Sequence, residues 1–299
     1  EAMALSIALP SARGATAYAT LEPCAHTGAR GPSCAQSLIE AGIARVVVAT
    51  MDPDPRTNGA GAAALRAAGV TVVMDAAGYA PASTGQSSAP PAHNPPPTPA
   101  TAMAAAARGA MAGWWSTATR GRPFVTLKLA TSLDGCIAMA DGSSRWITGD
   151  RARAHAHLVR ARCDAILVGR GTWDADRPAL DVRLPGLSHR APARLLLTSS
   201  APPAGLDGGW TCVDSPAAAL ALPHIQHILV EGGAGAAAAF LRGGLVDQLL
   251  IYRAPILLGR GHPALGDIGL SALADAHGQW RLQDARTLGN DRLDVYDRA

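Results

Sequence analysis

Several residue types are scarce in this chain of 299 residues, and each scarcity argues against a class of protein. Aromatic residues make up only 4% of the sequence, and Lys128 is the only lysine. The remaining positive charge is carried by arginines that are scattered along the chain, and the formal net charge is +3. Scattered basic charge does not suggest binding to nucleic acid or to a membrane surface.

Cysteines and long apolar runs are scarce as well. The five cysteines, at positions 24, 34, 136, 163 and 212, form no even, regularly spaced framework, which argues against a disulfide scaffold and indicates a reducing compartment. No apolar run approaches the length of a membrane span, and no leader pattern opens the chain. We therefore expect a cytoplasmic protein. Because the chain opens at Glu1 inside a helical pattern that Pro10 ends, we also expect its beginning to be missing.

The length and the apolar pattern predict two α/β domains joined by a linker. Strand-like and helix-like segments alternate with short connections over residues 1–75 and again over residues 120–299, which predicts mostly parallel sheets covered by helices. Residues 76–119 lie between them. Seven prolines occur from Pro81 to Pro99, so we expect a flexible, partly extended linker.

Two cysteines lie at the two ends of one Gly/Pro-rich loop in the first domain. Cys24 follows an alternating segment, residues 15–20, that predicts a strand, and Ser33 is a natural N-cap for a helix that begins at Cys34. Thiolates in this setting favour zinc, although two cysteines in an Ala-rich chain can also be small apolar fillers. The loop follows a strand of an α/β sheet, where binding sites usually form.

Two features of the second domain indicate binding of anionic groups. The strand that ends near Glu231 continues into Gly-Gly-Ala-Gly and a helix, so free backbone N–H groups could hold a cofactor phosphate. Arg160 and Arg183 could together bind a substrate phosphate. Each feature taken singly has an ordinary alternative, which is a simple glycine turn in the first case and surface ion pairs in the second.

Motifs in both domains follow one another in a fixed order. The first domain contains Glu1-Ala, Glu22-Pro-Cys-Ala-His-Thr-Gly28, Cys34, Asp52-Pro-Asp-Pro55 and Gly59-Ala-Gly61. The second contains Leu127-Lys-Leu-x-x-Ser-Leu-Asp-Gly135, Ser144-x-Trp-Ile-Thr-Gly149, Asp164-Ala-Ile-Leu-Val-Gly-x-Gly-Thr172, Val230-Glu-Gly-Gly233 and Ala254-Pro-x-Leu-Leu-Gly259. On these motifs the chain resembles the bacterial bifunctional riboflavin-biosynthesis deaminase/reductases over almost all of its length apart from the linker.

The resemblance implies a cytidine-deaminase-like α/β/α domain, incomplete at its start, and a dihydrofolate-reductase-like α/β domain. In the first domain it implies one zinc ion with Cys24 and Cys34 as ligands and Glu1 as the catalytic acid/base. The family's third ligand is a histidine two residues before this glutamate, and the chain contains no such position. His26 lies near the cysteines, but a residue two positions after Cys24 usually points elsewhere.

In the second domain the resemblance implies an NADPH-dependent reductase. The implied substrate contacts are Ser144, Arg160, Leu180, Arg183 and Glu231. The implied NADPH contacts are Ala130, Trp146, Thr172, Asp176, Ser199, Gly233, Ala234, Gly235, Ala236, Ala237, Ala238 and Ala239. Lys128 and Asp134 lie where they could polarise the sugar of the substrate.

Three hypotheses about function follow. The first is a bifunctional enzyme, expected to be a homo-oligomer, that deaminates a diaminopyrimidine ribosyl 5′-phosphate with zinc and then reduces the ribosyl chain to ribityl with NADPH. In the second, only the reductase works and the first domain is a structural or oligomerisation module. The third is a non-catalytic nucleotide-binding module, which the joint presence of Ser144, Arg160, Arg183 and Glu231 makes the weakest of the three.

Overall fold

The computed structural model describes residues 1–8, 10–27, 31–74 and 99–299 of the chain. These residues form two compact units, Glu1–Arg120 and Gly121–Ala299. Each unit has its own sheet, and the two are described separately. Among the described residues, no helix is long and apolar enough to cross a membrane.

The first unit contains a three-stranded parallel sheet in the order β1-β2-β3. The strands are β1 (Thr16–Ala19), β2 (Arg45–Val48) and β3 (Thr71–Met74), and the helices that alternate with them are α1 (Ala2–Ala8), α2 (Cys34–Glu40) and α3 (Ala60–Ala67). Leu38, Val46 and Leu65 are almost completely buried between the sheet and these helices. The predicted alternation of strands and helices is confirmed here.

Two further helices, α4 (Pro99–Ala110) and α5 (Ala112–Arg120), occupy positions that we predicted to belong to a flexible linker. The prolines end at Pro99, which lies in the first turn of α4 where its missing N–H costs nothing. The residues that follow are rich in alanine, the strongest helix former. The expectation for residues 99–119 is therefore corrected, and the rest of the predicted linker, up to residue 98, lies outside the described residues.

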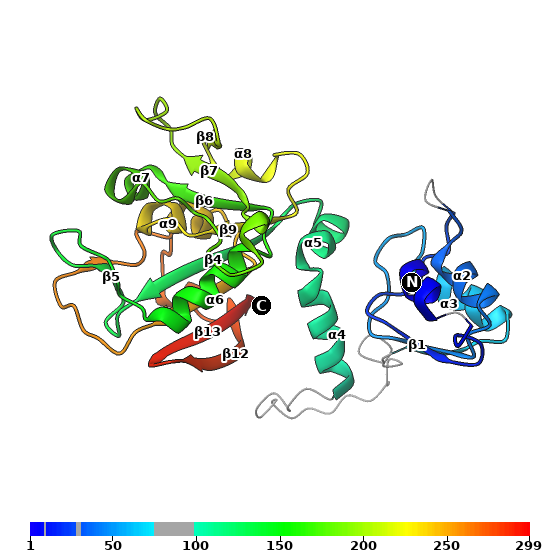
Figure 1. Ribbon diagram of the computed structural model, residues 1–299. Helices are drawn as coiled ribbons and strands as arrows, with labels where there is room; N and C mark the ends of the chain where they lie inside the picture. Colours follow the sequence, from blue (N-terminus) through cyan, green and yellow to red (C-terminus); the bar gives the residue numbers. More distant parts are fainter. Residues whose placement is uncertain (9, 28–30, 75–98) are drawn as a thin grey trace, which may run out of the picture. The chain divides into compact units, whose positions relative to one another are not determined.

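The second unit is organised around an eight-stranded sheet in the order β12-β13-β10-β4-β9-β6-β7-β8 (Figure 1). Its strands are β4 (Phe124–Thr131), β6 (Ala165–Gly169), β7 (Ala193–Leu197), β8 (Trp210–Val213), β9 (His227–Val230), β10 (Gln248–Arg253), β12 (Trp280–Leu288) and β13 (Asp291–Arg298). Strands β4 and β6–β10 pair in parallel, whereas β13 pairs with β10 and β12 in antiparallel fashion. A separate two-stranded ribbon pairs β5 (Cys136–Ala138) with β11 (His262–Pro263).

Alternate residues of the central strands reach the two faces of this sheet. On β6, Leu167 packs in one core with Phe240 of α9 (Ala234–Arg242), whereas Ile166 packs in a second core with Trp173 of α7 (Arg170–Asp176). Two further α-helices of this unit are α6 (Asp150–Arg160) and the short α8 (Pro216–Leu220). Burial on both faces explains why these strands are almost wholly apolar. The carboxyl ends of the parallel strands consequently share one edge, where polar side chains are free to gather.

Candidate functional site

The cysteine loop brings together the three residues predicted for the first unit. The Cys34 N–H donates to Cys24 Sγ over 3.3 Å, and α2 begins at Cys34 with Ser33 as its N-cap. Burial, with hydrogen bonds to Cys24 and to the Glu1 carboxylate, raises the pKa of the Cys34 thiol to about 12. The Cys34 thiol therefore lies next to both the Cys24 thiol and the Glu1 carboxylate.

These residues do not by themselves fit a complete zinc site. A structural or catalytic zinc ion takes at least three protein ligands, and no group of three His, Cys, Asp or Glu side chains with suitable geometry occurs within the described ranges. His26 belongs to no such group among the described residues, and its Nδ1 lies 3.3 Å from Thr57 Oγ1 on the loop before α3. The first unit thus holds two candidate ligands and a neighbouring carboxylate.

Glu22, two residues before Cys24, fixes the position of this loop. Its side chain is buried, and its carboxylate accepts N–H groups from Gly59 and Ala62 at the start of α3, each over 2.9 Å. A Cβ atom on Gly61 would lie 1.8 Å from the Pro23 carbonyl oxygen, so only glycine fits there. The two motifs that we read separately from the sequence are therefore in direct contact.

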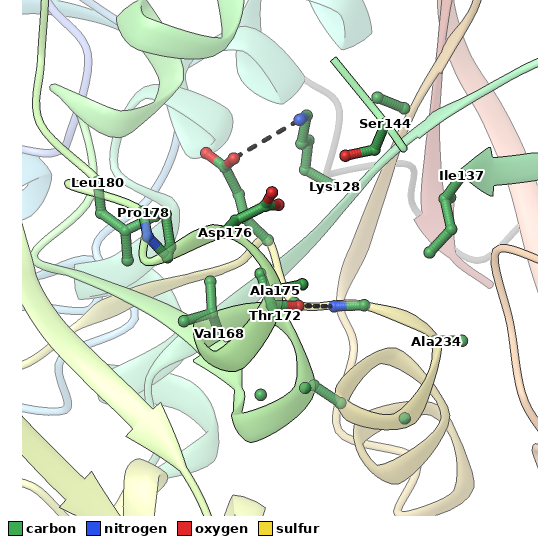
Figure 2. Close-up of a pocket in the computed structure, with 18 of the residues that line it drawn as sticks. Lys128, Ile137, Ser144, Val168, Thr172, Ala175, Asp176, Pro178, Leu180 and Ala234 are labelled. Carbon is green, nitrogen blue, oxygen red and sulfur yellow. Dashed lines mark hydrogen bonds and ion pairs between the residues drawn. The ribbon is translucent and has the colours of Figure 1, made fainter. Parts of the chain in front are cut away.

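A cavity of about 1410 Å³ lies in the second unit, at the carboxyl ends of β4, β6, β7 and β9 (Figure 2). All five predicted substrate residues line it, namely Ser144, Arg160, Leu180, Arg183 and Glu231. Ten of the twelve predicted cofactor residues line it as well: Ala130, Trp146, Thr172, Asp176, Ser199, Gly233, Ala234, Gly235, Ala236 and Ala239. The cavity is larger than the 300–1,000 Å³ of an ordinary small-molecule site and offers room for two ligands.

Ala237 and Ala238 are the two exceptions. Both are buried, and neither lines the cavity; Ala237 packs in the core beneath the sheet. They lie on α9, and with 3.6 residues per turn a straight helix can present only part of a continuous run to one side. The structure therefore places these two positions of the predicted run away from the cavity.

Glu231 is the electrostatic centre of the cavity. Its carboxylate accepts two hydrogen bonds from Arg160, of 2.7 and 2.9 Å, and Lys128 Nζ lies 3.5 Å from the second oxygen. Burial would raise the pKa of this group, but Lys128 and Arg160 outweigh it and hold the pKa at about 2. Glu231 is therefore ionised at any physiological pH.

The expected joint grip of Arg160 and Arg183 on one phosphate is not assembled in this structure. Arg160 uses Nε and Nη2 on Glu231 and donates from Nη1 to the Asp181 carbonyl oxygen over 3.0 Å. Arg183 pairs with the Asp181 carboxylate over 2.9 Å and is largely exposed. An incoming anion could take the place of Asp181 at the exposed Arg183 guanidinium, whereas the Arg160 guanidinium is held by Glu231.

The glycine turn between β9 and α9 provides a close-fitting cradle. A Cβ atom on Gly232 would lie 2.7 Å from Ala236 Cβ and 2.9 Å from Gly169 N, so the ends of β9 and β6 can approach only because this residue is glycine. The Gly233 N–H donates to Thr172 Oγ1 over 2.9 Å (Figure 2). The first-turn amides of α9 that follow have no acceptor within the helix, which fits the phosphates of a dinucleotide.

Trp146 and Asp176, two further predicted cofactor residues, are each in contact with an arginine. The Arg153 guanidinium lies 4.7 Å from the Trp146 ring centre, and Trp146 is 64% exposed. Arg145 donates to the Asp176 carbonyl oxygen over 3.0 Å and pairs with its carboxylate. Trp146 thus presents a partly exposed aromatic face within the cavity wall.

Asp134 is not placed where it could polarise a sugar. Its carboxylate accepts from the Ser132 hydroxyl and from the Gly259 N–H, the latter over 2.7 Å, and it does not line the cavity. The hydrogen bond from Ser132, followed by that from Gly259, lowers its pKa. Asp134 therefore connects the turn after β4 to the loop after β10. Of the two residues considered for polarising the sugar, Lys128 lines the cavity and Asp134 does not.

Sequence reasoning missed six basic residues of the cavity wall, namely Arg145, Arg153, His157, Arg170, Arg177 and His262. His157 precedes Arg160 by three residues on α6, so helical spacing from a known site residue could have found it. Nothing in the spacing of Arg145 and Arg153 distinguishes them from the other scattered arginines.

Comparison with known proteins gives matches over both units. The family model described as "RibD C-terminal domain" matches residues 123–209 and 212–293, and the "Cytidine and deoxycytidylate deaminase zinc-binding region" matches residues 1–50. The riboflavin biosynthesis protein RibD of Corynebacterium ammoniagenes is 38% identical over 292 residues, which cover 91% of this chain and 78% of that protein. The Escherichia coli protein of the same name is 34% identical, with 97% and 84% covered.

Solved structures agree with these matches. The structure described as Acinetobacter baumannii RibD, form 1, is similar with a TM-score of 0.75 and 30% identity, and covers 100% of this chain and 85% of that one. A Thermotoga maritima diaminohydroxyphosphoribosylaminopyrimidine deaminase/5-amino-6-(5-phosphoribosylamino)uracil reductase is similar with a TM-score of 0.72 and 26% identity, and covers 96% and 80%.

Proposed function

The chain belongs to the RibD family of riboflavin-biosynthesis proteins, and from this premise we propose that its second unit is a working NADPH-dependent reductase for a pyrimidine ribosyl 5′-phosphate. The family combines a deaminase-type unit with a reductase unit, and the chain contains both. The single observation that carries the proposal is the cavity in which Glu231 holds Arg160 and Lys128 beside the cradle of α9.

The chain's own residues divide the cavity into two parts. We assign the substrate to Ser144, Arg160, Leu180, Arg183 and Glu231, with Lys128 and Glu231 as the charged pair nearest the reacting sugar. We assign NADPH to the cradle at the start of α9, with Trp146, Thr172, Asp176 and Ser199 along its path. When bound, NADPH supplies a hydride to the ribosyl chain; the residues bind, orient and exclude water around the reacting groups.

The test is substrate-dependent oxidation of NADPH by the purified chain, followed by the loss of absorbance of the reduced nicotinamide. Turnover is expected when the deaminated pyrimidine ribosyl phosphate is supplied. A folded sample that binds NADPH but does not oxidise it with this substrate would overturn the reductase assignment. NADPH binding is measured separately by fluorescence titration, so a failure of binding and a failure of chemistry are told apart.

For the first unit we propose that Cys24 and Cys34 are metal ligands and that Glu1 is the catalytic acid/base. The proximity of the two sulfurs and of Glu1 supports this assignment. The second hypothesis, in which only the reductase works, is the alternative. Elemental analysis separates the two: about one zinc ion per chain favours a working metal site, and no zinc favours the reductase alone.

The expected assembly and location belong to the same proposal. We propose a homo-oligomer, which light scattering of the purified protein would test by mass. A cytoplasmic location is supported by the five cysteines, all of which are free thiols in the structure. Reduced thiols in protein isolated under non-reducing conditions are the expected result.

A further inference from the structure

His157 lies in the cavity wall but has no part in the assignments above. It occupies α6, one turn before Arg160, and lines the same cavity as Arg183 and Glu231. Its side chain is partly buried, and the residues around it carry the charges of Arg160, Arg183 and Asp181. The Arg160 charge is neutralised by Glu231 and that of Asp181 by Arg183, so this end of the cavity has no surplus negative charge.

One ring nitrogen of His157 is already engaged with the loop that carries Arg183. Nδ1 lies 3.3 Å from the Arg183 backbone nitrogen and 3.1 Å from the Asp181 carbonyl oxygen. It cannot accept from the first and donate to the second at the same time. The Asp181 carbonyl already receives a hydrogen bond from Arg160, whereas the Arg183 N–H has no other acceptor within the described part of the chain.

This asymmetry favours the tautomer in which Nδ1 accepts from the Arg183 N–H, because the Asp181 carbonyl oxygen keeps its hydrogen bond from Arg160. If Nδ1 accepts from the Arg183 N–H, the proton of the neutral ring is on Nε2. Burial, followed by the nearby charge of Arg160, lowers the pKa of His157, so the neutral ring dominates at neutral pH. Nε2 makes no hydrogen bond to any described residue, which leaves a fixed N–H donor without a protein partner beside Arg183.

We infer that His157 is a further substrate-binding residue, whose Nε2–H donates to the phosphate of the substrate next to Arg183. Nδ1 holds the ring against the Arg183 backbone, so the donor is oriented before the anion arrives. A phosphate that displaces Asp181 from Arg183 would then meet a guanidinium on one side and a preset imidazole N–H on the other. The inference rests on the proposed function, because it presumes a phosphate-bearing substrate in this cavity.

The experiment is calorimetric titration of the full chain with ribose 5-phosphate as the probe, at one neutral pH. In His157→Asn, the side-chain oxygen can still accept the Arg183 N–H, but no atom reaches the position of Nε2. We expect about tenfold weaker binding of ribose 5-phosphate, as for the loss of one hydrogen bond to a charged group. NADPH affinity, measured by fluorescence, should change less than about twofold, because the loop is retained.

Two variants complete the design. His189→Asn changes an exposed histidine of the short helix Ser188–Arg190, which does not line the cavity, and should bind the probe as the wild type does. His157→Ala removes both contacts and should bind the probe no more tightly than His157→Asn. Unchanged affinity in His157→Asn, or an equal loss of probe and NADPH affinity, overturns the inference. Failure of the wild type to bind the probe also overturns it, whereas failure of NADPH oxidation with normal probe binding overturns the proposed function alone.

Discussion

The two units each bury a glutamate shortly after a parallel strand, and the two carboxylates are held in opposite ways. Glu22 follows β1 and is 2% exposed, and Glu231 directly follows β9 with a side chain that is 7% exposed. Among the described residues, Glu22 accepts hydrogen bonds only from backbone N–H groups, those of Gly59, Ala62 and, over a longer distance, Asp52. Glu231 is held by the side chains of Arg160 and Lys128.

The kind of partner separates a structural carboxylate from a functional one. Backbone amides at the start of α3 cannot move without unfolding the loop, so Glu22 fastens two segments and leaves Cys24 in a fixed position. Side-chain cations can exchange partners when a ligand enters. Arg160 and Lys128, the cations that pair with Glu231, both line a cavity. Burial alone would not have distinguished the two residues.

The largest expected effect is that of Glu231→Gln. The substitution leaves Arg160 and Lys128 without a compensating charge, and breaking a buried pair in this way costs about 4 kcal/mol. If that energy supports the transition state, kcat/KM for NADPH oxidation should fall about a thousandfold. Steady-state kinetics with varied substrate at saturating NADPH measures the loss.

Glu22→Gln is the matched control: its amide oxygen can replace only one of the two carboxylate oxygens, so a backbone N–H loses its acceptor, but every group affected belongs to the first unit. We expect the reductase kcat/KM of Glu22→Gln to remain within about twofold of the wild type, since the change lies in the other unit. A large loss of reductase activity in Glu22→Gln, or full activity in Glu231→Gln, would contradict the distinction drawn between the two carboxylates.

Gly61→Ala should give the next largest effect, confined to the first unit. The new Cβ would lie 1.8 Å from the Pro23 carbonyl oxygen, so the contact between the cysteine loop and α3 has to open. We expect a loss of about 3 kcal/mol in the free energy of unfolding of this unit, measured by chemical denaturation. Gly109→Ala is the control: it also lies in a helix of this unit, where a Cβ meets nothing within 4 Å, and should be neutral or slightly stabilising.

The fold and much of the cavity wall could be predicted because they depend on local signals. The apolar strands β2, β4, β6 and β9 are recognisable from their composition, and the motifs contain the cavity residues Ser144, Thr172 and Glu231. The antiparallel hairpin of β12 and β13 was not anticipated. On the outer strand β12, no residue is fully buried, so it lacks the alternation that marks a half-buried strand.

Pairings between distant residues could not be predicted. The sequence contains Glu22 and Gly61 in recognisable motifs, but their contact through Pro23 depends on how α3 packs against the loop. From the sequence, Asp134 and Lys128 were equally plausible as residues that polarise the sugar. In the structure, the Asp134 carboxylate instead accepts a hydrogen bond from Gly259, on the loop after β10. The spacing of residues along the sequence predicts which residue types belong to a site, but it does not predict which distant residue each side chain contacts.

Arg183→Ala is expected to have a moderate effect, restricted to one ligand. Arg183 is largely exposed and forms an ion pair with the neighbouring Asp181, so its removal should cost little stability. If it binds the substrate phosphate, KM for the substrate should rise about 30-fold, as for one charge-assisted contact, while KM for NADPH stays within about twofold. Equal increases in both constants would refute its assignment to the substrate.

The smallest expected effect compares the N-caps of the two units. Ser33 Oγ accepts the Gln36 N–H at the start of α2, and Ser215 Oγ accepts the Ala218 N–H at the start of α8. Each Ser→Ala change should lower the free energy of unfolding by about 1 kcal/mol. Because the units have separate cores, we expect Ser33→Ala to weaken only the first unit and Ser215→Ala only the second. Hydrogen exchange resolved along the chain measures both, and loss of protection across both units from a single change would show that they unfold together.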